Sequence, residues 1–431
     1  MSLIPTLGLL AALVLQPGAP EAGELGGEFQ PLSSPVAHEG TVHLVSMEER
    51  DDPEANYWIY VLAESADRIH RVRFGPGGAE VEASIPIGMF PVTMEGPHGI
   101  QVAPDGRHFY VTTGHGIPDG KFWKFDLEAS APVGEPIDLG RFPATLDVTP
   151  DGLYAFVVNF NLYGAMVPSS VSAVHLPTMT EVARTETCTM PHGSRVSHDG
   201  LHQYSVCMMD DQLVEISTRD FEVSRRFSLV TGEEGPLDPQ MMADQDHGDH
   251  MDPGAHEDHH EHDPAPEAGD RTAHDPAGAG AHHSTCTPTW ADPSPDNRFL
   301  YVACSATDQV LEIDRENWEL VRTFSTGRGP YNLEATPDGR LLVVTLKQGS
   351  GVEFLDLETG ESLAIRDSSI TVTHGVVVSP DSRYAFVSVE GVGAEPGKVD
   401  IYDLDTLERV DSVEVRQQAA GIAFYRMDPA P

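Results

Sequence analysis

The chain has 431 residues, of which 40% are hydrophobic, so it is long enough to bury a sizeable core. Its 68 acidic residues outnumber its 26 basic residues, which gives a formal net charge of −42. Because nucleic-acid phosphates repel such a surface, the composition excludes nucleic acid as an expected partner. A solvated acidic surface is the simpler explanation of this charge, and attraction of cations is the functional one.

The chain begins with an apolar run at residues 3–15 that is too short to cross a bilayer, which takes about 20 helical residues. The run resembles the apolar region of a signal peptide, although no Lys or Arg precedes it. We therefore expect residues 1–22 to be a signal peptide and residues 23–40 a linker. The mature protein is then expected to be periplasmic or secreted, with no membrane span.

One unit recurs along the rest of the chain: a short apolar strand, a tight turn and a second strand. The clearest copy runs from His98 to Thr112 and reads HGIQVAPDGRHFYVT, with Asp and Gly where a turn needs them. Copies lie 42 to 48 residues apart, except for one gap of 97. A strand-and-turn repeat of about 40 to 50 residues predicts a β-propeller. The turns begin at Pro104, Pro150, His198, Pro295, Pro337 and Pro380.

Six turns predict six blades, and strands expected at 57–62, 68–74 and 79–85 predict another at the start of the chain. This first blade lacks an innermost strand, whereas residues 420–425 begin a repeat that does not continue. We therefore predict an all-β, seven-bladed propeller over residues 41–431, closed by a C-terminal strand that completes the first blade. The other blades are expected at about 92–140, 141–187, 188–231, 286–327, 328–370 and 371–417.

The long gap is explained by an insertion at residues 233–285, between blades four and five. The tract is rich in His, Asp and Glu and nearly free of apolar residues, so we expect it to be disordered. Such a composition indicates metal binding, and an acidic, pH-responsive solvating loop is the alternative. Its histidines are His247, His250, His256, His259, His260, His262, His274, His282 and His283.

Several repeat sequences carry a resemblance to a known family: TPDGRLLVVT at 336–345, SPDNRFLYVAC at 294–304, QVLEID at 309–314 and KVDIYDL at 398–404. With these segments the chain resembles the YVTN-type seven-bladed β-propellers. The resemblance covers all but the leader and the insertion, and it implies the fold. Proteins of this broad architecture include ligand-binding surface proteins, lactonases and the propeller domain of nitrous oxide reductase. The resemblance therefore does not assign a chemistry.

Aligning the repeats places a His at the start of the inner strand in three of the seven blades, at His98, His192 and His374. Inner strands begin beside the central channel, so these side chains are expected to converge at one mouth. Converging neutral imidazoles bind Zn, Cu, Ni or Fe, and three of them leave a ligand position open. The alternative is that each His packs and hydrogen-bonds within the channel. The equivalent positions elsewhere are Ala144, Thr289, Tyr331 and Ala420.

All four cysteines are expected on the same rim as these histidines, in neighbouring blades. Four Cys in an exported chain predict two disulfides, for which three pairings exist. We favour pairing within blades, Cys188 with Cys207 and Cys286 with Cys304.

Other residues of this rim are candidate metal ligands. The loops between second and third strands hold His115 in blade two and Cys207 and Met208 in blade four. An alternative to the disulfides is a soft-metal site of Cys207, Met208, Met190 and His192, which would suit Cu(I).

Three functions follow from these features. The first is an exported propeller that binds copper or zinc through the mouth histidines and the His-rich tract, for metal handling or metal-dependent redox chemistry. The second is a non-catalytic scaffold for another exported protein or a polymer. The third is a lactonase-like hydrolase using carboxylates such as Glu95, Asp147 or Glu334, with no catalytic residue identified. The sequence has no nucleotide motif and no CxxCH haem site.

Overall fold

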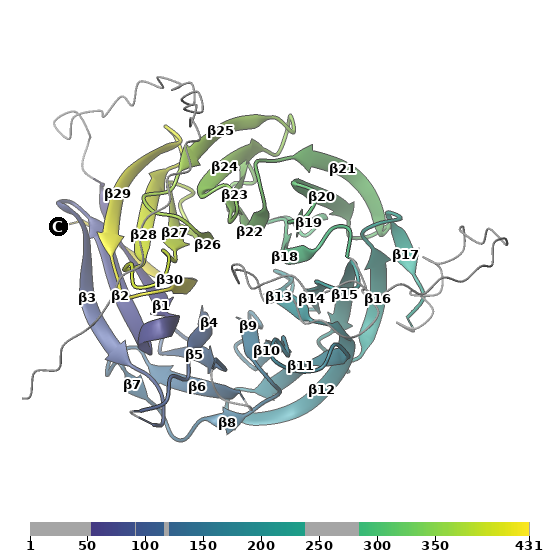
Figure 1. Ribbon diagram of the computed structural model, residues 1–431, viewed down its shortest axis with the longest axis horizontal. Helices are drawn as coiled ribbons and strands as arrows, with labels where there is room; N and C mark the ends of the chain where they lie inside the picture. The colour runs from purple at the N-terminus through teal and green to yellow at the C-terminus, as the bar shows by residue number, and fades with distance from the viewer. Residues whose placement is uncertain (1–52, 91, 116–119, 238–283, 431) are drawn as a thin grey trace, which may run out of the picture. The chain divides into compact units, whose positions relative to one another are not determined.

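The computed structural model describes residues 53–90, 92–115, 120–237 and 284–430, all within one compact unit. They form seven antiparallel sheets arranged as blades around a central channel (Figure 1). The predicted seven-bladed β-propeller is confirmed. The expected signal peptide and linker, and the nine histidines of the inserted tract, lie outside the described residues. Among the residues described, no helix has the length and apolar character that a membrane crossing requires.

The first blade confirms the predicted closure of the ring. The C-terminal strand lies innermost and pairs antiparallel with β1, from Ala55 opposite Pro429 to Ala63 opposite Ala419. The two ends of the described chain therefore complete one sheet, which leaves no gap in the ring. From inside to outside this blade consists of β30 (Ala419–Pro429), β1 (Ala55–Ala63), β2 (Arg68–Gly75) and β3 (Gly78–Pro86), with the short 3-10 helix η2 (Glu64–Ala66) between β1 and β2.

The other six blades follow in chain order, each with its inner strand first. Blade two has β4 (Pro97–Val102), β5 (His108–Thr113), β6 (Lys121–Asp126), β7 (Ala131–Pro132) and β8 (Ile137–Asp138). Blade three has β9 (Pro143–Val148), β10 (Tyr154–Asn159), β11 (Pro168–His175) and β12 (Thr180–Thr189). Blade four has β13 (Pro191–Val196), β14 (His202–Cys207), β15 (Gln212–Ser217), β16 (Val223–Ser228) and β17 (Glu233–Gly235).

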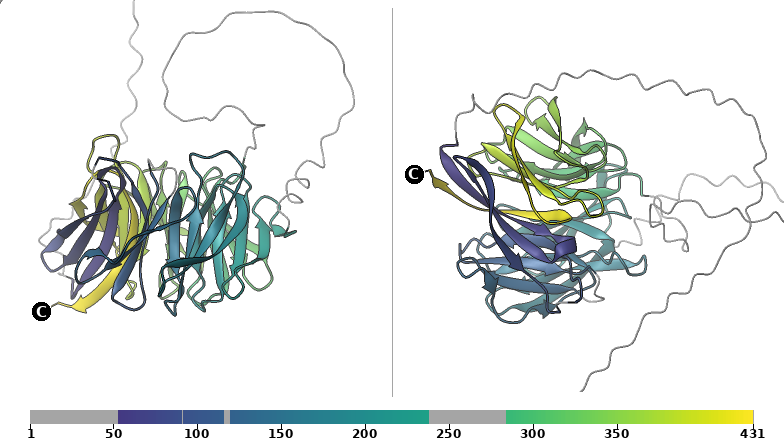
Figure 2. Two further views of the ribbon diagram at one scale, coloured as in Figure 1. Left: turned by 90° about the horizontal axis from the view of Figure 1, so that it is seen from below. Right: turned by 60° about the vertical axis from the view of Figure 1, so that its left-hand side comes forward.

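Blades five to seven are regular four-stranded sheets. Blade five has β18 (Pro288–Pro293), β19 (Phe299–Cys304), β20 (Gln309–Asp314) and β21 (Glu319–Ser325). Blade six has β22 (Pro330–Ala335), β23 (Leu341–Leu346), β24 (Gly351–Asp356) and β25 (Ser362–Asp367). Blade seven has β26 (Thr373–Val378), β27 (Tyr384–Val389), β28 (Lys398–Asp403) and β29 (Glu408–Glu414). Figure 2 shows these strands running between two faces that carry the loops.

The repeated turn owes its shape to its Asp and Gly, as the copy between β9 and β10 illustrates. The Asp151 carboxylate accepts hydrogen bonds from the Thr149 hydroxyl (2.6 Å) and from the Leu153 N–H (3.0 Å). Gly152 has a φ of 71°, in the left-handed region that favours glycine. The turn residues therefore fix where each inner strand ends and the second strand begins.

The inner strands of neighbouring blades approach each other so closely that the residue after the mouth His must be glycine. A Cβ atom added to Gly99 would lie 2.4 Å from the Ala144 carbonyl oxygen. Gly421, which follows Ala420 at the equivalent position of blade one, is under the same constraint, because a Cβ atom there would lie 2.2 Å from the carbonyl oxygen of His98. Part of the His-Gly pattern is thus a packing requirement, and it holds the preceding side chain at the channel mouth.

The hydrophobic core is divided among the spaces between blades. Between blades one and two, for example, Tyr60 stacks on Phe109 at 4.7 Å between ring centroids, and Phe109 stacks on Phe125 at 4.9 Å. All three rings are fully buried. Each blade thus buries both of its faces, and the inner strands are held by packing from both sides.

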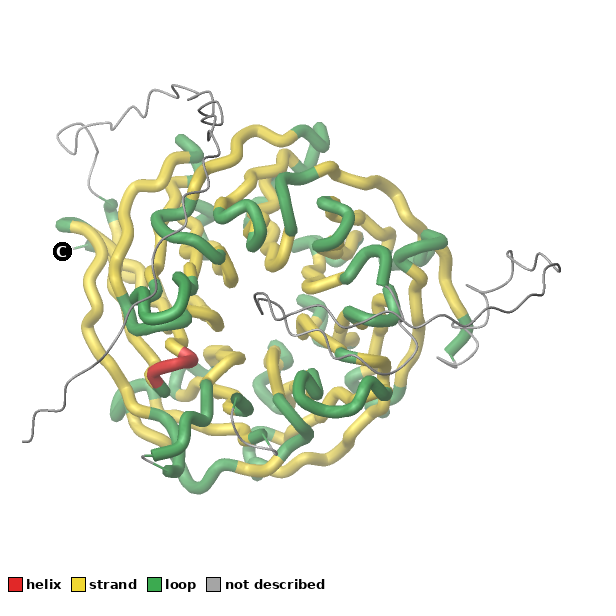
Figure 3. Tube along the Cα trace, viewed as in Figure 1, coloured by secondary structure: helices red, strands yellow, loops and turns green. Residues whose placement is uncertain are grey.

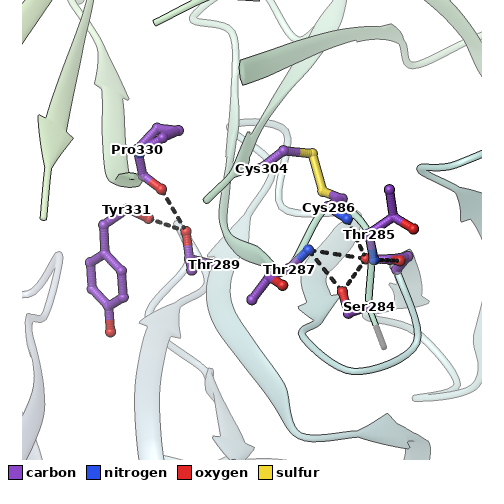
Figure 4. Close-up of a disulfide and its surroundings, with 9 residues drawn as sticks. Ser284, Thr285, Cys286, Thr287, Thr289, Cys304, Pro330 and Tyr331 are labelled. Atoms are coloured by element: carbon purple, nitrogen blue, oxygen red, sulfur yellow. Dashed lines mark hydrogen bonds between the residues drawn. A yellow bond between two sulfur atoms is a disulfide. The ribbon is translucent and has the colours of Figure 1, made fainter. Parts of the chain in front are cut away.

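Two disulfides stabilise one face, and their pairing is the one favoured from the sequence. They join Cys188 to Cys207 and Cys286 to Cys304, of which Figure 4 shows the second. Only the second lies within one blade. Cys188 belongs to β12, the outer strand of blade three, which extends to Thr189 and so beyond the expected end of that blade at about residue 187. Its disulfide therefore links blade three to blade four.

The insertion is shorter than predicted and its C-terminal end is anchored. Residues 233–235 form β17, which pairs with β16, instead of belonging to the expected disordered tract. After the tract, the buried Asp211 carboxylate accepts hydrogen bonds from the backbone N–H groups of Cys286 (3.0 Å) and Thr287 (3.1 Å) and from the Ser284 hydroxyl (Figure 4). The chain therefore re-enters the propeller at a fixed point on this face.

Replacing both cysteines of the Cys188–Cys207 disulfide by Ser should destabilise the protein. The bridge closes a loop of 19 residues, so its loss should lower the free energy of unfolding by about 3 kcal/mol. Urea unfolding of the double variant and the oxidised wild type would measure the difference. Equal midpoints would contradict the assigned pairing.

The stability of the fold should decrease with mild acidification, in part because of His70. Burial, reinforced by the charges of Arg416 and Arg68, lowers the pKa of His70 to about 4. Between pH 7 and pH 5 the unfolded chain gains a proton at this position while the folded chain does not, which costs about 2 kcal/mol of stability at pH 5.

The His70→Gln variant tests this pH dependence. It should lose about 2 kcal/mol less stability than the wild type between pH 7 and pH 5, because its side chain does not titrate. Urea unfolding at the two pH values provides the measurement. An identical loss in both proteins would show that His70 is not the titrating group.

Candidate metal site at the channel mouth

Three polar side chains from blades one and two meet at one mouth of the channel. Glu64 lies in η2, the loop between the second and third strands of blade one, which Figure 3 draws in red. His98 lies on the inner strand β4, and His115 follows β5. Antiparallel strands alternate in direction, so the end of a second strand and the start of an inner strand lie on the same face.

The Glu64 carboxylate bridges the two imidazoles. Its Oε1 lies 2.5 Å from His98 Nδ1, and its Oε2 lies 2.8 Å from His115 Nε2. The ligand atoms of these three residues all lie within 4.8 Å of one another, and no other such group of His, Cys, Asp and Glu occurs among the described residues. One carboxylate oxygen and two imidazole nitrogens therefore lie close enough together to hold a single metal ion.

Electrostatics keep the carboxylate ionised although Glu64 is only 2% exposed. Burial alone would raise the pKa of Glu64, but the charges and hydrogen bonds of His98 and His115 together hold that pKa well below its usual range. A buried anion beside two imidazoles is the charge pattern that a divalent cation requires.

Neighbouring groups orient these ligand atoms. Gln418 Nε2 donates a hydrogen bond to Glu64 Oε2 (2.8 Å), and the Tyr163 hydroxyl lies 3.0 Å from His115 Nδ1. The ring of Phe142 contacts His115 edge-on at 4.4 Å between centroids. The second nitrogen of His115 thus has a partner, as expected for a ligating imidazole.

The predicted trio of mouth histidines is brought together only in part. The ring of His98 contacts those of His374 and His192 edge-on, at 5.7 and 6.3 Å between centroids. The three residues nevertheless do not form a ligand group of the kind described above. Of the predicted ligands, His98 and His115 belong to the group, whereas His192 and His374 lie beside it.

His192, which lies beside the ligand group, is a neutral imidazole. Its Nδ1 donates a hydrogen bond to the Thr289 carbonyl (2.7 Å), which leaves Nε2 with a lone pair. Burial, reinforced by His98, lowers the pKa of His192 to about 3. Its Nε2 lies 3.5 Å from the Tyr331 hydroxyl, at the limit of a hydrogen bond.

His374 is also neutral and incompletely paired. Burial, followed by the charges of Lys347 and His98, lowers the pKa of His374 well below its usual value. Its Nε2 lies 3.8 Å from Glu390 Oε1, which pairs with Lys347 at 2.9 Å. Its Nδ1 is buried without a hydrogen-bond partner.

The alternative soft-metal site is corrected by the structure. The sulfur of Cys207 is bonded to Cys188, so it is not a thiolate and cannot serve as the expected Cu(I) ligand. Met208 and Met190 pack instead against the apolar cluster that contains Phe142 and Phe160.

The three carboxylates considered for a hydrolase do not lie together in the structure. Asp147 and Glu334 line a channel cavity of about 610 Å³ that also reaches His98 and His374. Glu95 is buried elsewhere, and its Oε1 accepts hydrogen bonds from the backbone N–H groups of Met89 (2.5 Å) and Phe90 (3.1 Å). Glu95 thus stabilises the loop that precedes blade two.

Sequence reasoning missed Glu64, Tyr163, Lys347 and Glu390, which surround the histidines. All four occupy the loop between the second and third strands of a blade, the same position as His115. Applying that position to every blade, instead of only to those with His or Cys, would have found them.

Comparison with known proteins supports the fold. No family model and no curated protein matches the chain. Similar solved structures include a 6-phosphogluconolactonase-like protein of Bacteroides uniformis, at 12% identity and a TM-score of 0.59 over 87% of this chain and 100% of that chain. Another from Bacteroides fragilis has 12% identity and a TM-score of 0.56, over 85% and 98%.

A hydrazine synthase structure from Kuenenia stuttgartiensis is also similar, with 12% identity and a TM-score of 0.53 over 87% of this chain and 98% of that chain. Identities this low establish a shared β-propeller architecture and no shared chemistry. Membership of the YVTN-type family therefore stays a prediction from the sequence motifs.

Proposed function

We propose that the protein is an exported β-propeller that binds a transition-metal ion at the mouth of its channel. The observation that carries this proposal is the convergence of one carboxylate oxygen and two imidazole nitrogens, from Glu64, His98 and His115, within 4.8 Å of one another. The histidines come from the predicted set, and the carboxylate supplies the charge that a neutral His trio would lack.

Zinc is the ion that this donor set fits best among the two expected metals. Two imidazoles and one carboxylate hold zinc in sites that keep a fourth position open for water or substrate. Copper(II) also accepts imidazole and carboxylate ligands, and it is the ion that metal-dependent redox chemistry would need. With Cys207 in a disulfide, no thiolate favours Cu(I) over zinc here.

Metal handling is the role that these features support. The mouth site offers three ligands, of which Glu64 is buried and the two histidines are partly buried. The inserted tract instead offers many histidines next to acidic residues. The tract returns to the propeller at Asp211, on the face that carries the mouth site. We propose that the tract gathers ions and that the mouth site holds one of them tightly.

A scaffold function is the second candidate, and an exposed apolar loop favours it. Phe90 is 58% exposed and Val92 is 93% exposed in the loop between β3 and β4, on the face of the mouth site. Met89 and Met94 in the same loop are also exposed. Such a cluster suits contact with another protein or a polymer. The lactonase-like alternative rests on similarity of fold alone.

Removing one ligand of the mouth site should abolish tight metal binding. Untagged wild type, dialysed against low zinc, should retain about one ion per chain, and His115→Ala should raise the Kd for zinc at least about 100-fold, because an open site with two ligands binds weakly. Elemental analysis and competition with a fluorescent chelator would measure both quantities.

His108→Ala is a matched control for this experiment. His108 also pairs with a carboxylate, that of Asp105 at 2.6 Å, but it is the first residue of β5, next to the turn on the other face. The His108→Ala variant should bind zinc with the same stoichiometry and Kd as the wild type. A tightly held ion that survives His115→Ala and Glu64→Gln would exclude the mouth site, and metal bound only by the tract would favour the scaffold.

Deleting residues 238–283 should separate the two classes of binding. The shortened protein should keep the single tight ion and lose the weaker ions, because the tract holds nine of the 20 histidines close together in the sequence. Calorimetric titration with zinc and copper provides the stoichiometries. An unchanged number of weak ions would refute the capture role of the tract.

A further inference from the structure

Four aromatic side chains beside the metal site form a floor across the channel mouth. The second residue of the inner strand supplies them in blades two, four, six and seven, as His98, His192, Tyr331 and His374. Each of these rings contacts the next around a closed circle, at 6.3, 5.8, 4.8 and 5.7 Å between centroids. A ligand of the metal ion would therefore lie on the loop side of this floor.

The residues that directly follow the second strands of the blades form a collar around this floor, and the collar is divided by polarity. Blades six, seven and one supply Lys347, Glu390 and Glu64. Blades three and four supply Phe160 and Met208 at the same position. The collar thus offers charged groups on one side of the metal ligands and apolar groups on the other.

The charges of the collar leave a place for one anion once a divalent metal ion is bound. Glu64, Lys347 and Glu390 are the charged residues of the collar in the seven described blades. In the floor, His192 and His374 are neutral because burial lowers their pKa values. Two carboxylates and one ammonium carry a single negative charge, which a divalent ion would convert to a single positive charge. A monoanion at the open ligand position of the metal would balance that charge.

Lys347 and Tyr331, both partly exposed, can donate hydrogen bonds to such an anion. Lys347 Nζ lies 2.9 Å from Glu390 Oε1 and 4.2 Å from the centroid of the Tyr331 ring. Burial would lower the pKa of Lys347, but the Tyr331 oxygen and the charges of Glu390 and Glu64 raise that pKa above its usual range. Lys347 is therefore an ammonium group, which has three N–H donors. The Tyr331 hydroxyl makes a long contact with His192 Nε2, at 3.5 Å, so it is also available to a ligand.

The apolar side of the collar lies directly against the histidines. Phe142 contacts the rings of His115 and His98 at 4.4 and 5.3 Å between centroids, and Phe160 contacts the ring of His192 at 5.0 Å. Three further side chains pack on these phenyl rings and are partly exposed: Leu162, Met190 and Met208. Partly exposed apolar side chains beside a polar site provide contact area for the apolar group of a ligand.

A structural role explains part of this arrangement. The ion pair of Lys347 with Glu390 joins blades six and seven, and the Met208 N–H donates a hydrogen bond to the Met190 carbonyl (3.1 Å). Neither contact requires partly exposed apolar side chains next to the metal ligands, or an ammonium group that shares the mouth with them.

We propose that the metal-loaded mouth binds a small monocarboxylate with an apolar group. The carboxylate takes the open ligand position of the metal ion and accepts hydrogen bonds from the Lys347 ammonium and the Tyr331 hydroxyl. The apolar group packs on Leu162, Met190 and Met208. This inference rests on the proposed metal site and names the class of ligand that completes it.

Calorimetric titration of the zinc-loaded, full-length protein with 3-phenylpropanoate tests this inference. One molecule should bind per chain, at least about 10-fold more tightly than acetate, because acetate has little apolar surface to bury. The uncharged 3-phenylpropanamide should bind at least about 10-fold more weakly than 3-phenylpropanoate, because it lacks the charge that the metal and Lys347 attract. The metal-free protein should not bind 3-phenylpropanoate.

Lys347→Met and Lys121→Met form a matched pair for the same titration. Both lysines pair with a carboxylate, but Lys121 pairs with Asp138 and lies on β6, the third strand of blade two. Lys347→Met should weaken 3-phenylpropanoate binding at least about 10-fold, because a bond to a charged group is lost, and Lys121→Met should not change it. Both variants should bind zinc at least as tightly as the wild type, which separates the anion site from the metal site.

Met208→Ser tests the apolar contact. It should weaken 3-phenylpropanoate binding about 5-fold and leave acetate binding unchanged, because only the larger ligand reaches this side chain. A tightly held zinc ion without saturable binding of 3-phenylpropanoate would overturn this inference alone, as would binding that neither Lys347→Met nor Met208→Ser weakens. Absence of a tightly held zinc ion would overturn the proposed metal site together with it.

Discussion

The pairing of β30 with β1 is the interaction on which the whole arrangement depends. It joins the two ends of the described chain in one sheet and closes the ring of blades. Closure forces the inner strands into close contact, to the point that only glycine fits at Gly99 and Gly421. Because these strands are fixed, side chains from distant parts of the sequence meet at the channel mouth. Ring closure by this pairing thus brings equivalent positions of the sequence repeat together at one site.

The two halves of the channel use this rigidity differently. At the mouth, Glu64 from a loop meets His98 from an inner strand, so the site combines a fixed ligand with one that a loop positions. Deeper in the channel, the carboxylates of Asp147 and Asp292 belong to inner strands and accept hydrogen bonds from backbone N–H groups of neighbouring blades. These deeper groups therefore contribute to the stability of the ring.

The fold could be predicted from the sequence because the same turn residues and apolar strands recur in successive blades. Turns such as the one at Asp151 and Gly152 need those residues, and they mark every blade but the first. The first blade lacks this turn, and the sequence predicts it because residues 420–425 begin a repeat that does not continue. The pairing of the cysteines followed from their positions, although the crossing from blade three to blade four did not, because strand ends are set by tertiary contacts.

The site was only half predictable for a physical reason. A His that recurs at one repeat position, such as His98 or His192, stands out in a sequence. Glu64 does not, because it is one of 68 acidic residues in the chain, and acidic residues usually serve only to keep a surface solvated. Only the spatial position of η2 distinguishes this carboxylate. The side-chain directions that exclude His192 and His374 from the ligand group depend on contacts such as that with the Thr289 carbonyl.

The most direct test of the account is an anomalous difference map from crystals of the untagged protein grown with zinc, recorded on both sides of the zinc absorption edge. The account predicts one strong peak at the channel mouth, about 2.0 to 2.2 Å from Glu64, His98 and His115. A mouth without a peak, in a crystal that holds zinc elsewhere on the propeller, would contradict it.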